Sequence, residues 1–382
     1  MHKFLALLKD KEFTQSGTSS TENVSGWLRL NLIRGIGPRT GRQLVAACGS
    51  IEAIWNGTSA NWRRIDGIGP KLLKELEQSG SNQASHILEQ CKTHSISVIC
   101  PDDKAWPEAF SAMDDAPLVL FAKGDLTVLK YPKLLAVVGA RKASREGRML
   151  TRRWCRFLSE HGTGIASGMA YGIDAAAHGG TLEGRAPTIA VLGSGLNAPF
   201  SPEQQRQIEA VSAQGCVISE FLPETEARPE HFPRRNRIIA GLTKATLVME
   251  ADIQSGSLIT ARCAADYGRE VLAVPGSVLA GNHAGCHQLI RDGAALVESP
   301  EDILYALGWQ MHSRQKNTSD YKPANTSEAK IIETLEGEIL HIDTLAEHCG
   351  LTVSELSPIL LALELLGVVE RLPGSRYALG DG

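Results

Sequence analysis

The 382-residue chain lacks several features, and each absence excludes a class of protein. It has no run of 18 apolar residues, so no membrane-spanning helix is predicted. Its eight cysteines contain no C-x-x-C pair, which indicates neither a zinc site nor a disulfide framework and favours a reducing cytoplasm. No G-x-x-x-x-G-K-[ST] motif is present, which argues against an ATP-driven motor. Aromatic residues make up only 5%, so few rings are available to stack on bases.

The net charge of −4, from 39 basic and 43 acidic residues, hides an uneven distribution. Residues 26–78 contain eight Lys/Arg and four Asp/Glu, a local charge of +4. Residues 329–382 contain three and nine, a local charge of −6. A basic surface attracts a polyanion and an acidic one repels it. We therefore predict different partners for the two ends of the chain.

Composition and periodicity divide the chain into five segments. Residues 1–22 are predicted to form a frayed or helical leader and not a signal peptide. Charges follow its short apolar patch where a signal peptide would have a small-residue cleavage site. We predict a helical domain at 23–95, an α/β domain at 96–308, a polar linker at 309–328 and a small domain at 329–382.

Short, nearly all-apolar runs that alternate with helical patterns define the α/β domain. Such runs are buried on both faces, as in a doubly wound, mainly parallel sheet covered by helices. The predicted strands are 134–138, 188–192, 216–219, 246–249 and 271–274. Ligands of these sheets bind beyond the carboxyl ends of the strands, so we expect the functional site at that edge.

Two segments beyond these strand ends indicate an anionic ligand. Residues 231–241 place three arginines and an asparagine in four positions before an apolar run. Residues 255–260 place glycine and hydroxyl groups at a predicted helix start. Guanidinium groups and helix starts both bind phosphate oxygens. The pattern predicts a surface for a phosphodiester or a nucleotide, with Glu220 and Glu250 orienting the arginines.

A helix predicted at 144–161 carries four arginines on the side opposite its apolar residues, at 145, 148, 152 and 156. A solvated charged face and an extension of a phosphate-binding track both explain this stripe.

The N-terminal region repeats a Gly-Ile-Gly-Pro motif, at 35–38 and at 67–70. The two copies resemble paired helix–hairpin–helix motifs, in which a glycine turn brings backbone N–H groups to a DNA phosphate. Tight packing of helices would require the same glycines, so DNA contact and protein contact both remain open for this module.

Three constellations are discounted. Residues 193–198 match the dinucleotide pattern G-x-G-x-x-G/A, but Pro199 and Pro202 follow where the phosphate-binding helix should run. Ser167, Asp174 and His178 suggest a hydrolytic triad, but no G-x-S-x-G elbow surrounds the serine. These few ligands also do not make a zinc site. We therefore expect no catalytic residues, no metal and no cofactor.

The last fifty residues predict three helices, at 329–335, 343–349 and 354–366, followed by a hairpin from 368 to 379. This order is typical of a winged helix. Many winged helices bind duplex DNA, but the local charge of −6 favours contact with a protein here.

The α/β domain resembles the DNA-processing protein A (Smf) family of bacteria, over roughly residues 105–300. The resemblance rests on five motifs in order: Val137–Arg141, Ser167–His178, Phe232–Gly241, Ser255–Thr260 and Arg269–Gly276. It implies an extended Rossmann fold that binds single-stranded DNA without known chemistry. A helix–hairpin–helix or SAM-like module before this fold and a winged helix after it also fit longer members of the family.

The resemblance also implies which residues line the path of the DNA strand. By motif position they are Arg141, Ser167, Gly168, Phe232, Arg234, Arg235, Asn236, Arg237, Ser255, Gly256, Ser257 and Thr260. Phe232 is either a platform for a base or a core anchor, and Tyr171 is a second candidate platform. The sequence departs from the family at Ala140, which replaces a serine, and across 193–202.

Members of this family protect incoming single strands during natural transformation, help to load RecA recombinase and act as homodimers. We expect these roles and partners for this chain, with no membrane association. The alternative is a nucleotide-processing Rossmann enzyme that cleaves the N-glycosidic bond of a nucleoside monophosphate, and a structural adaptor is the third possibility. Such enzymes carry a Gly-Gly-x-Gly-Thr-x-x-Glu motif, whose nearest counterpart here is 255–257, without the glutamate.

Overall fold

A computed structural model of the chain describes residues 21–57, 62, 65, 68–309, 323–336, 338–366, 368–372 and 374–379. The chain divides into two compact units, 1–311 and 312–382. Most of the predicted leader and linker lies outside the described residues. Helix α1 begins at Thr21 and α14 at Thr326, inside the segments predicted as leader and linker. None of the helices within the described ranges is both long and apolar enough to cross a membrane.

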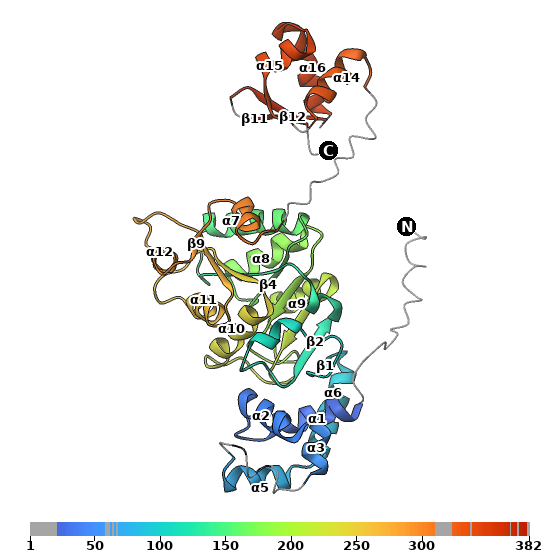
Figure 1. The fold of residues 1–382 in the computed structure, drawn as a ribbon, viewed down its shortest axis with the longest axis vertical. Helices are drawn as coiled ribbons and strands as arrows, with labels where there is room; N and C mark the ends of the chain where they lie inside the picture. Colours follow the sequence, from blue (N-terminus) through green and yellow to red (C-terminus); the bar gives the residue numbers. More distant parts are fainter. Residues whose placement is uncertain are drawn as a thin grey trace. The chain divides into compact units, whose positions relative to one another are not determined.

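A mainly parallel sheet forms the centre of the first unit (Figure 1). Its strand order is β1-β2-β6-β5-β4-β3-β7-β8-β9. Strands β3 to β9 run parallel, and β2 and β1 extend the sheet antiparallel beyond β6. The strands are β1 Ser97–Ile99, β2 Leu120–Gly124, β3 Leu134–Val138, β4 Gly164–Ser167, β5 Thr188–Val191, β6 Cys216–Ser219, β7 Ala245–Val248, β8 Glu270–Ala273 and β9 Ala295–Leu296.

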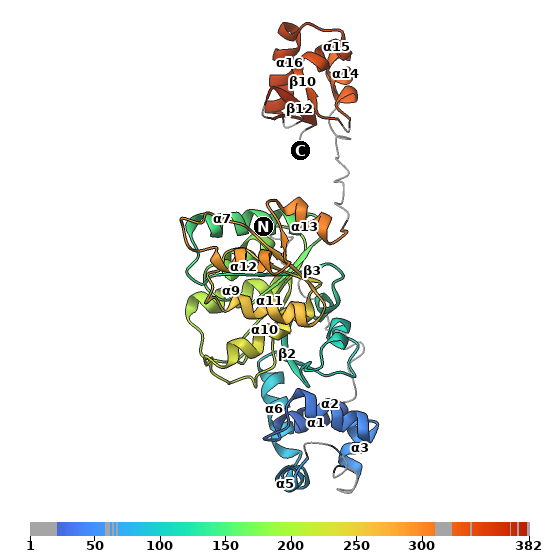
Figure 2. The ribbon, with the colours of Figure 1, turned by 60° about the vertical axis from the view of Figure 1, so that its left-hand side comes forward.

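Helices cover both faces of this sheet, so the predicted doubly wound α/β fold is confirmed. Alternate residues of β3 show the division: Leu134 and Ala136 pack in the core beneath α10, α11 and α12, whereas Leu135 and Val137 pack against α7, α8 and α13. Figure 2 shows α10, α11 and α12 together on one face. The helices are α7 Arg145–Glu160, α8 Ile173–Leu182, α9 Pro202–Gln214, α10 His231–Leu242, α11 Ser257–Asp266, α12 Ala284–Arg291 and α13 Pro300–Ala306, with 3-10 turns η1 Glu108–Ala112 and η2 Leu126–Lys130.

Within the described residues, five helices precede the sheet: α1 Thr21–Leu32, α2 Pro38–Cys48, α3 Ile51–Asn56, α5 Pro70–Gln78 and α6 Asn82–Thr93. The first Gly-Ile-Gly-Pro turn joins α1 to α2, and Gly35 adopts φ +98°, which favours glycine. The second copy lies partly outside the described residues, and its Gly69 caps α5.

The helical module shares one hydrophobic core with the sheet. Trp27 Nε1 donates to an Asp102 carboxylate oxygen at 2.7 Å. The backbone of Gly41 packs on Leu118, and a Cβ at Gly41 would lie 2.6 Å from a Leu118 methyl carbon. The two predicted domains therefore meet through apolar contact as well as through the chain.

The second unit has the helix order of a winged helix, as the sequence predicts. It contains helices α14 Thr326–Thr334, α15 Ile342–Cys349 and α16 Val353–Leu365. A small sheet in the order β10-β12-β11 packs with them, built from Leu340–His341, Arg376–Leu379 and Val369–Leu372. Its apolar residues form a separate core.

Candidate nucleic-acid interface

The topology creates a crevice at the carboxyl ends of β3 and β7. From β3 the chain proceeds through β4, β5 and β6 toward one edge, then returns to place β7 on the other side of β3. Connections that leave in opposite directions open a gap above the sheet, where ligands bind in folds of this class. A pocket of about 820 Å³ lies there, lined by residues after β3, after β7 and at the starts of α10 and α11.

Two exposed cations and two helix starts face this pocket, an arrangement that favours an anionic ligand. Arg141 and Lys142 follow β3, line the pocket and are exposed. The N-terminal ends of α10 and α11 also face it, and each carries the partial positive charge of the helix dipole. Two of the acids in the lining, Asp174 and Glu250, are buried and bonded to backbone N–H groups, whereas Asp252 is exposed.

Eight of the twelve predicted site residues line this pocket: Arg141, Phe232, Arg235, Asn236, Ser255, Gly256, Ser257 and Thr260. Gly168 lines a second pocket of about 420 Å³, and both pockets share Arg141, Ala170, Phe232 and Arg235 as walls. Ser167, Arg234 and Arg237 line neither of these two pockets.

Arg235 is buried, with 4% of its surface exposed, although its charge suggested a surface residue. Its guanidinium donates to the carbonyls of Gly168 and Val191, and its Nε donates to Asn236 Oδ1 at 3.0 Å. Burial lowers its pKa to about 10, against the raising effect of Asp174. Arg235 therefore joins α10 to the ends of β4 and β5, and only part of it faces the pockets.

Asp174 and His178 are structural parts of the same region. Asp174 accepts from the N–H groups of Gly168 and Ala170 at 3.2 and 3.3 Å, and burial raises its pKa despite nearby Arg235. His178 Nδ1 lies 2.7 Å from Thr188 Oγ1, and burial lowers the pKa of this histidine to about 4. The hydroxyl of Ser167 donates to the Val137 carbonyl at 2.7 Å. A side-chain hydrogen bond links Ser167 to Asp174, whereas His178 bonds to Thr188, so the three residues do not form a Ser–His–Asp chain.

Glu220 orients two arginines of α10, as predicted. Its carboxylate pairs with Arg234 Nε at 3.0 Å and with the buried guanidinium of Arg237. Arg237 also donates to the carbonyl of Asp115, which fastens α10 to the segment after η1. Glu250 instead accepts from Ser144 N at 2.9 Å and Ser144 Oγ at 2.6 Å, next to the start of α7, so the expectation that it orients arginines is wrong.

Phe232 stands between the two pockets and is packed as an anchor, and its role as a platform for a base stays a prediction. The guanidinium carbon of Arg141 lies 4.5 Å from its ring centroid, within cation–π range. A Cβ at Gly193 would lie 2.9 Å from the ring, so the ring is packed closely on the backbone there. Tyr171, the other candidate platform, lines the second pocket and is 58% exposed.

Asn236 connects the arginine block to the hydroxyl-rich segment. Its Nδ2 donates to the Gly256 carbonyl at 3.2 Å, so the starts of α10 and α11 are fixed relative to each other. The hydroxyls of Ser255 and Ser257 are 2.7 Å apart. These residues lie together at one edge of the sheet, as their sequence positions predict.

Four polar residues of the lining were missed: Lys142, Asp252, Gln254 and Asn282. Lys142 follows Arg141 directly after a predicted strand, and that position was a readable signal. Gln254 and Asn282 lie in loops whose composition does not distinguish them from other surface loops.

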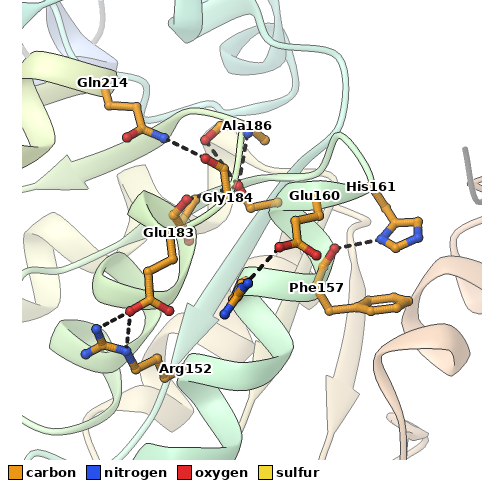
Figure 3. Close-up of polar contacts among 11 residues, drawn as sticks. Arg152, Phe157, Glu160, His161, Glu183, Gly184, Ala186 and Gln214 are labelled. Carbon is orange, nitrogen blue, oxygen red and sulfur yellow. Dashed lines mark hydrogen bonds and ion pairs between the residues drawn. The ribbon is translucent and has the colours of Figure 1, made fainter. Parts of the chain in front are cut away.

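The arginine stripe of α7 is partly neutralised (Figure 3). Arg152 Nε donates to Glu183 Oε1 at 2.8 Å, and Arg156 Nε pairs with Glu160 Oε1 at 3.0 Å. These pairs favour a solvated charged face over an extension of the phosphate-binding track.

Two families match the chain. DNA recombination-mediator protein A matches residues 97–308, and the DprA winged helix domain matches residues 315–375. Protein Smf of Escherichia coli strain K12 is 39% identical over 294 residues, which cover 75% of this chain and 78% of that protein. DNA processing protein DprA of Streptococcus pneumoniae is 44% identical over 202 residues, 53% of this chain and 71% of that protein.

Solved structures give the same result. The X-ray structure of DNA processing protein A from Streptococcus pneumoniae matches with a TM-score of 0.62 at 34% identity, over 73% of this chain and 95% of that one. A structure of DNA processing protein A from Helicobacter pylori, described for its single-stranded DNA binding mode, matches with a TM-score of 0.51 at 25% identity. It covers 57% of this chain and 97% of that one.

Proposed function

The chain belongs to the DNA recombination-mediator protein A family, and from this premise we propose that it binds single-stranded DNA in the two pockets at the carboxyl edge of its sheet. The observation that carries the proposal is the pocket above β3 and β7, where Arg141, Lys142 and two helix starts converge. A relative from Helicobacter pylori is described by its single-stranded DNA binding mode, which supports the same ligand.

The two pockets together suit a polymer better than a single nucleotide. They share the wall formed by Arg141, Phe232 and Arg235, so a strand that crosses this wall contacts both. Consecutive phosphates then meet Arg141, Lys142 and the helix starts in turn. With few aromatic residues in the chain, affinity depends mainly on phosphate contacts and falls as salt rises.

We further propose that this binding serves natural transformation. In this role a homodimer protects incoming single strands in the cytoplasm and helps to load RecA recombinase on them. Family membership supports these finer assignments. An assay of RecA filament formation on single strands covered by a single-strand-binding protein tests the loading step. Faster filament formation with the protein supports loading, and an unchanged lag contradicts it.

Binding is tested with fluorescence anisotropy of labelled oligo-dT. We expect Arg141→Gln with Lys142→Gln to weaken binding by about 10- to 100-fold and to reduce the slope of log K against log salt by about 1.4, or about 0.7 per lost phosphate contact. The matched control is Arg185→Gln with Lys244→Gln, which removes two exposed cations near the amino ends of β5 and β7. Equal loss in both pairs would show that the pocket has no special part in binding.

We propose no catalytic step. Ser167 and Asp174, which offered the chemistry of a hydrolase, already bond within the fold. Incubation with nucleoside monophosphates tests the alternative enzyme, and release of free base would establish it.

A further inference from the structure

Helix α16 occupies the place of the DNA-reading helix in a winged helix, but its chemistry differs. It follows α15 and a short turn and leads into the β11–β12 hairpin. DNA-reading helices bring arginine and lysine to phosphates and base edges. Between Val353 and Leu366 the sequence has no Lys or Arg, and its only charges are Glu355 and Glu364.

The outer side of α16 is also apolar. Leu356, Leu360 and Leu363 are buried in the core of the second unit. On the other side Leu361 is 58% exposed, and just beyond the helix Leu366 is 62% exposed. The exposed Pro358 and Ala362 lie beside these two leucines at i+3 and i+4 spacings, and contiguous apolar surface of this kind marks interaction sites on proteins.

One acidic side chain lies beside this surface, and the unit as a whole is acidic. Glu364 lies three residues from Leu361, on the same side of the helix, and is exposed. Residues 323–379 contain nine Asp/Glu and three Lys/Arg, a charge of 3 − 9 = −6. The ammonium of Lys330 donates to the Cys349 carbonyl at 3.0 Å.

We propose that the outer face of α16 docks a protein partner that presents a cationic amphipathic segment. Leu361 and Leu366 supply the apolar anchors, and Glu364 with the unit's acidic surface selects lysine- or arginine-rich sequences. The charge of −6 repels nucleic acid, and it also opposes a second copy of the same face. The partner must therefore carry positive charge.

Anisotropy of a labelled synthetic amphipathic helix of leucine and lysine, added to the full-length protein, tests the proposal. We expect Leu361→Ser with Leu366→Ser to weaken binding about tenfold or more, as loss of anchor residues does at interfaces. Glu364→Lys is expected to weaken it severalfold and to flatten its salt dependence. The matched control is Val278→Ser with Leu279→Ser, which replaces two apolar side chains of the first unit that are 80% and 95% exposed. It should bind as the unaltered protein does.

Three outcomes would overturn the proposal. They are equal weakening by both serine pairs, equal binding of a leucine–glutamate helix, and loss of oligo-dT binding in the Leu361/Leu366 pair. Far-ultraviolet circular dichroism and urea unfolding of each variant show whether it is folded, because the replaced side chains are largely exposed and should not alter stability by more than about 0.5 kcal/mol.

Discussion

Arg141 and Arg235 share one pocket wall, yet their removal should have opposite consequences. Arg235 is buried, donates to the Gly168 and Val191 carbonyls and lies near the buried carboxylate of Asp174. Arg235→Met leaves both carbonyls and the carboxylate without this partner. Removing one partner of a buried charge pair costs about 3–5 kcal/mol. Typical domains have only about 5–15 kcal/mol of stability, so this variant should lose a large part of it.

Arg141 is exposed, and its only described partner is the ring of Phe232, at 4.5 Å. An exposed cation–π contact contributes about 0.5–1 kcal/mol, so Arg141→Gln should change stability by no more than that. Its loss of a phosphate contact should instead weaken binding of oligo-dT about 5- to 10-fold, or about 1–1.4 kcal/mol.

Urea unfolding and oligo-dT anisotropy, measured on both variants and on Arg185→Gln as control, separate these effects. The expected pattern is a large fall in unfolding free energy for Arg235→Met alone. A fall in affinity at nearly full stability is expected for Arg141→Gln alone. If Arg235→Met kept its stability within about 0.5 kcal/mol, the assignment of Arg235 as a structural cation would be wrong.

Three further predictions concern the supports of the pocket. Burial lowers the pKa of His178 to about 4 in the folded state, against an ordinary 6.5. The contribution of neutral His178 to the free energy of unfolding should therefore be fully present above pH 6.5 and decrease by up to ~3 kcal/mol as the pH falls to 4. The raised pKa of Asp174 acts in the opposite direction, so the difference between the unaltered protein and His178→Gln, measured by urea unfolding across this range, isolates the histidine. Glu220→Gln should lower the free energy of unfolding by about 3 kcal/mol, because the buried charge of Arg237 then has only the more distant, partly exposed carboxylate of Asp115. Asp115→Asn, measured in the same assay, should lower it by less. Gly168→Ala should cost about 1–3 kcal/mol in thermal unfolding, since its Cβ would lie 2.5 Å from Arg235 nitrogens, whereas Gly69→Ala, with open space around it, should cost less than about 1 kcal/mol.

The sheet was readable from the sequence where burial leaves a compositional mark. All five predicted apolar runs are strands, because a strand covered on both faces must be apolar throughout. Strand β4, Gly164–Ser167, was missed because its burial comes from β3 and β5 on either side and not from large side chains of its own. The antiparallel β1 and β2 escaped prediction because neither is apolar throughout: β1, at the edge, begins with the exposed Ser97, and β2 ends in Lys123 and Gly124.

The sequence predicted the location of the site but not the contacts that its residues make. Motif order put Arg141, Phe232 and the α11 start at one edge of the sheet, where the pocket lies. The sequence could not show that Arg235 and Arg237 turn inward, because a charged residue is buried only when distant partners satisfy it. Those partners, the Val191 carbonyl and Glu220, are fixed by tertiary folding and leave no local pattern.

The contact of Gly41 with Leu118, together with the bond from Trp27 to Asp102, has a consequence for truncated forms of the chain. A domain with a hydrophobic core of its own can be removed without exposing apolar surface of its neighbour. Here apolar side chains of the helical module and of the sheet form one core. Deletion of either part would expose apolar surface of the other to water. We therefore expect residues 21–309 to unfold as one cooperative unit.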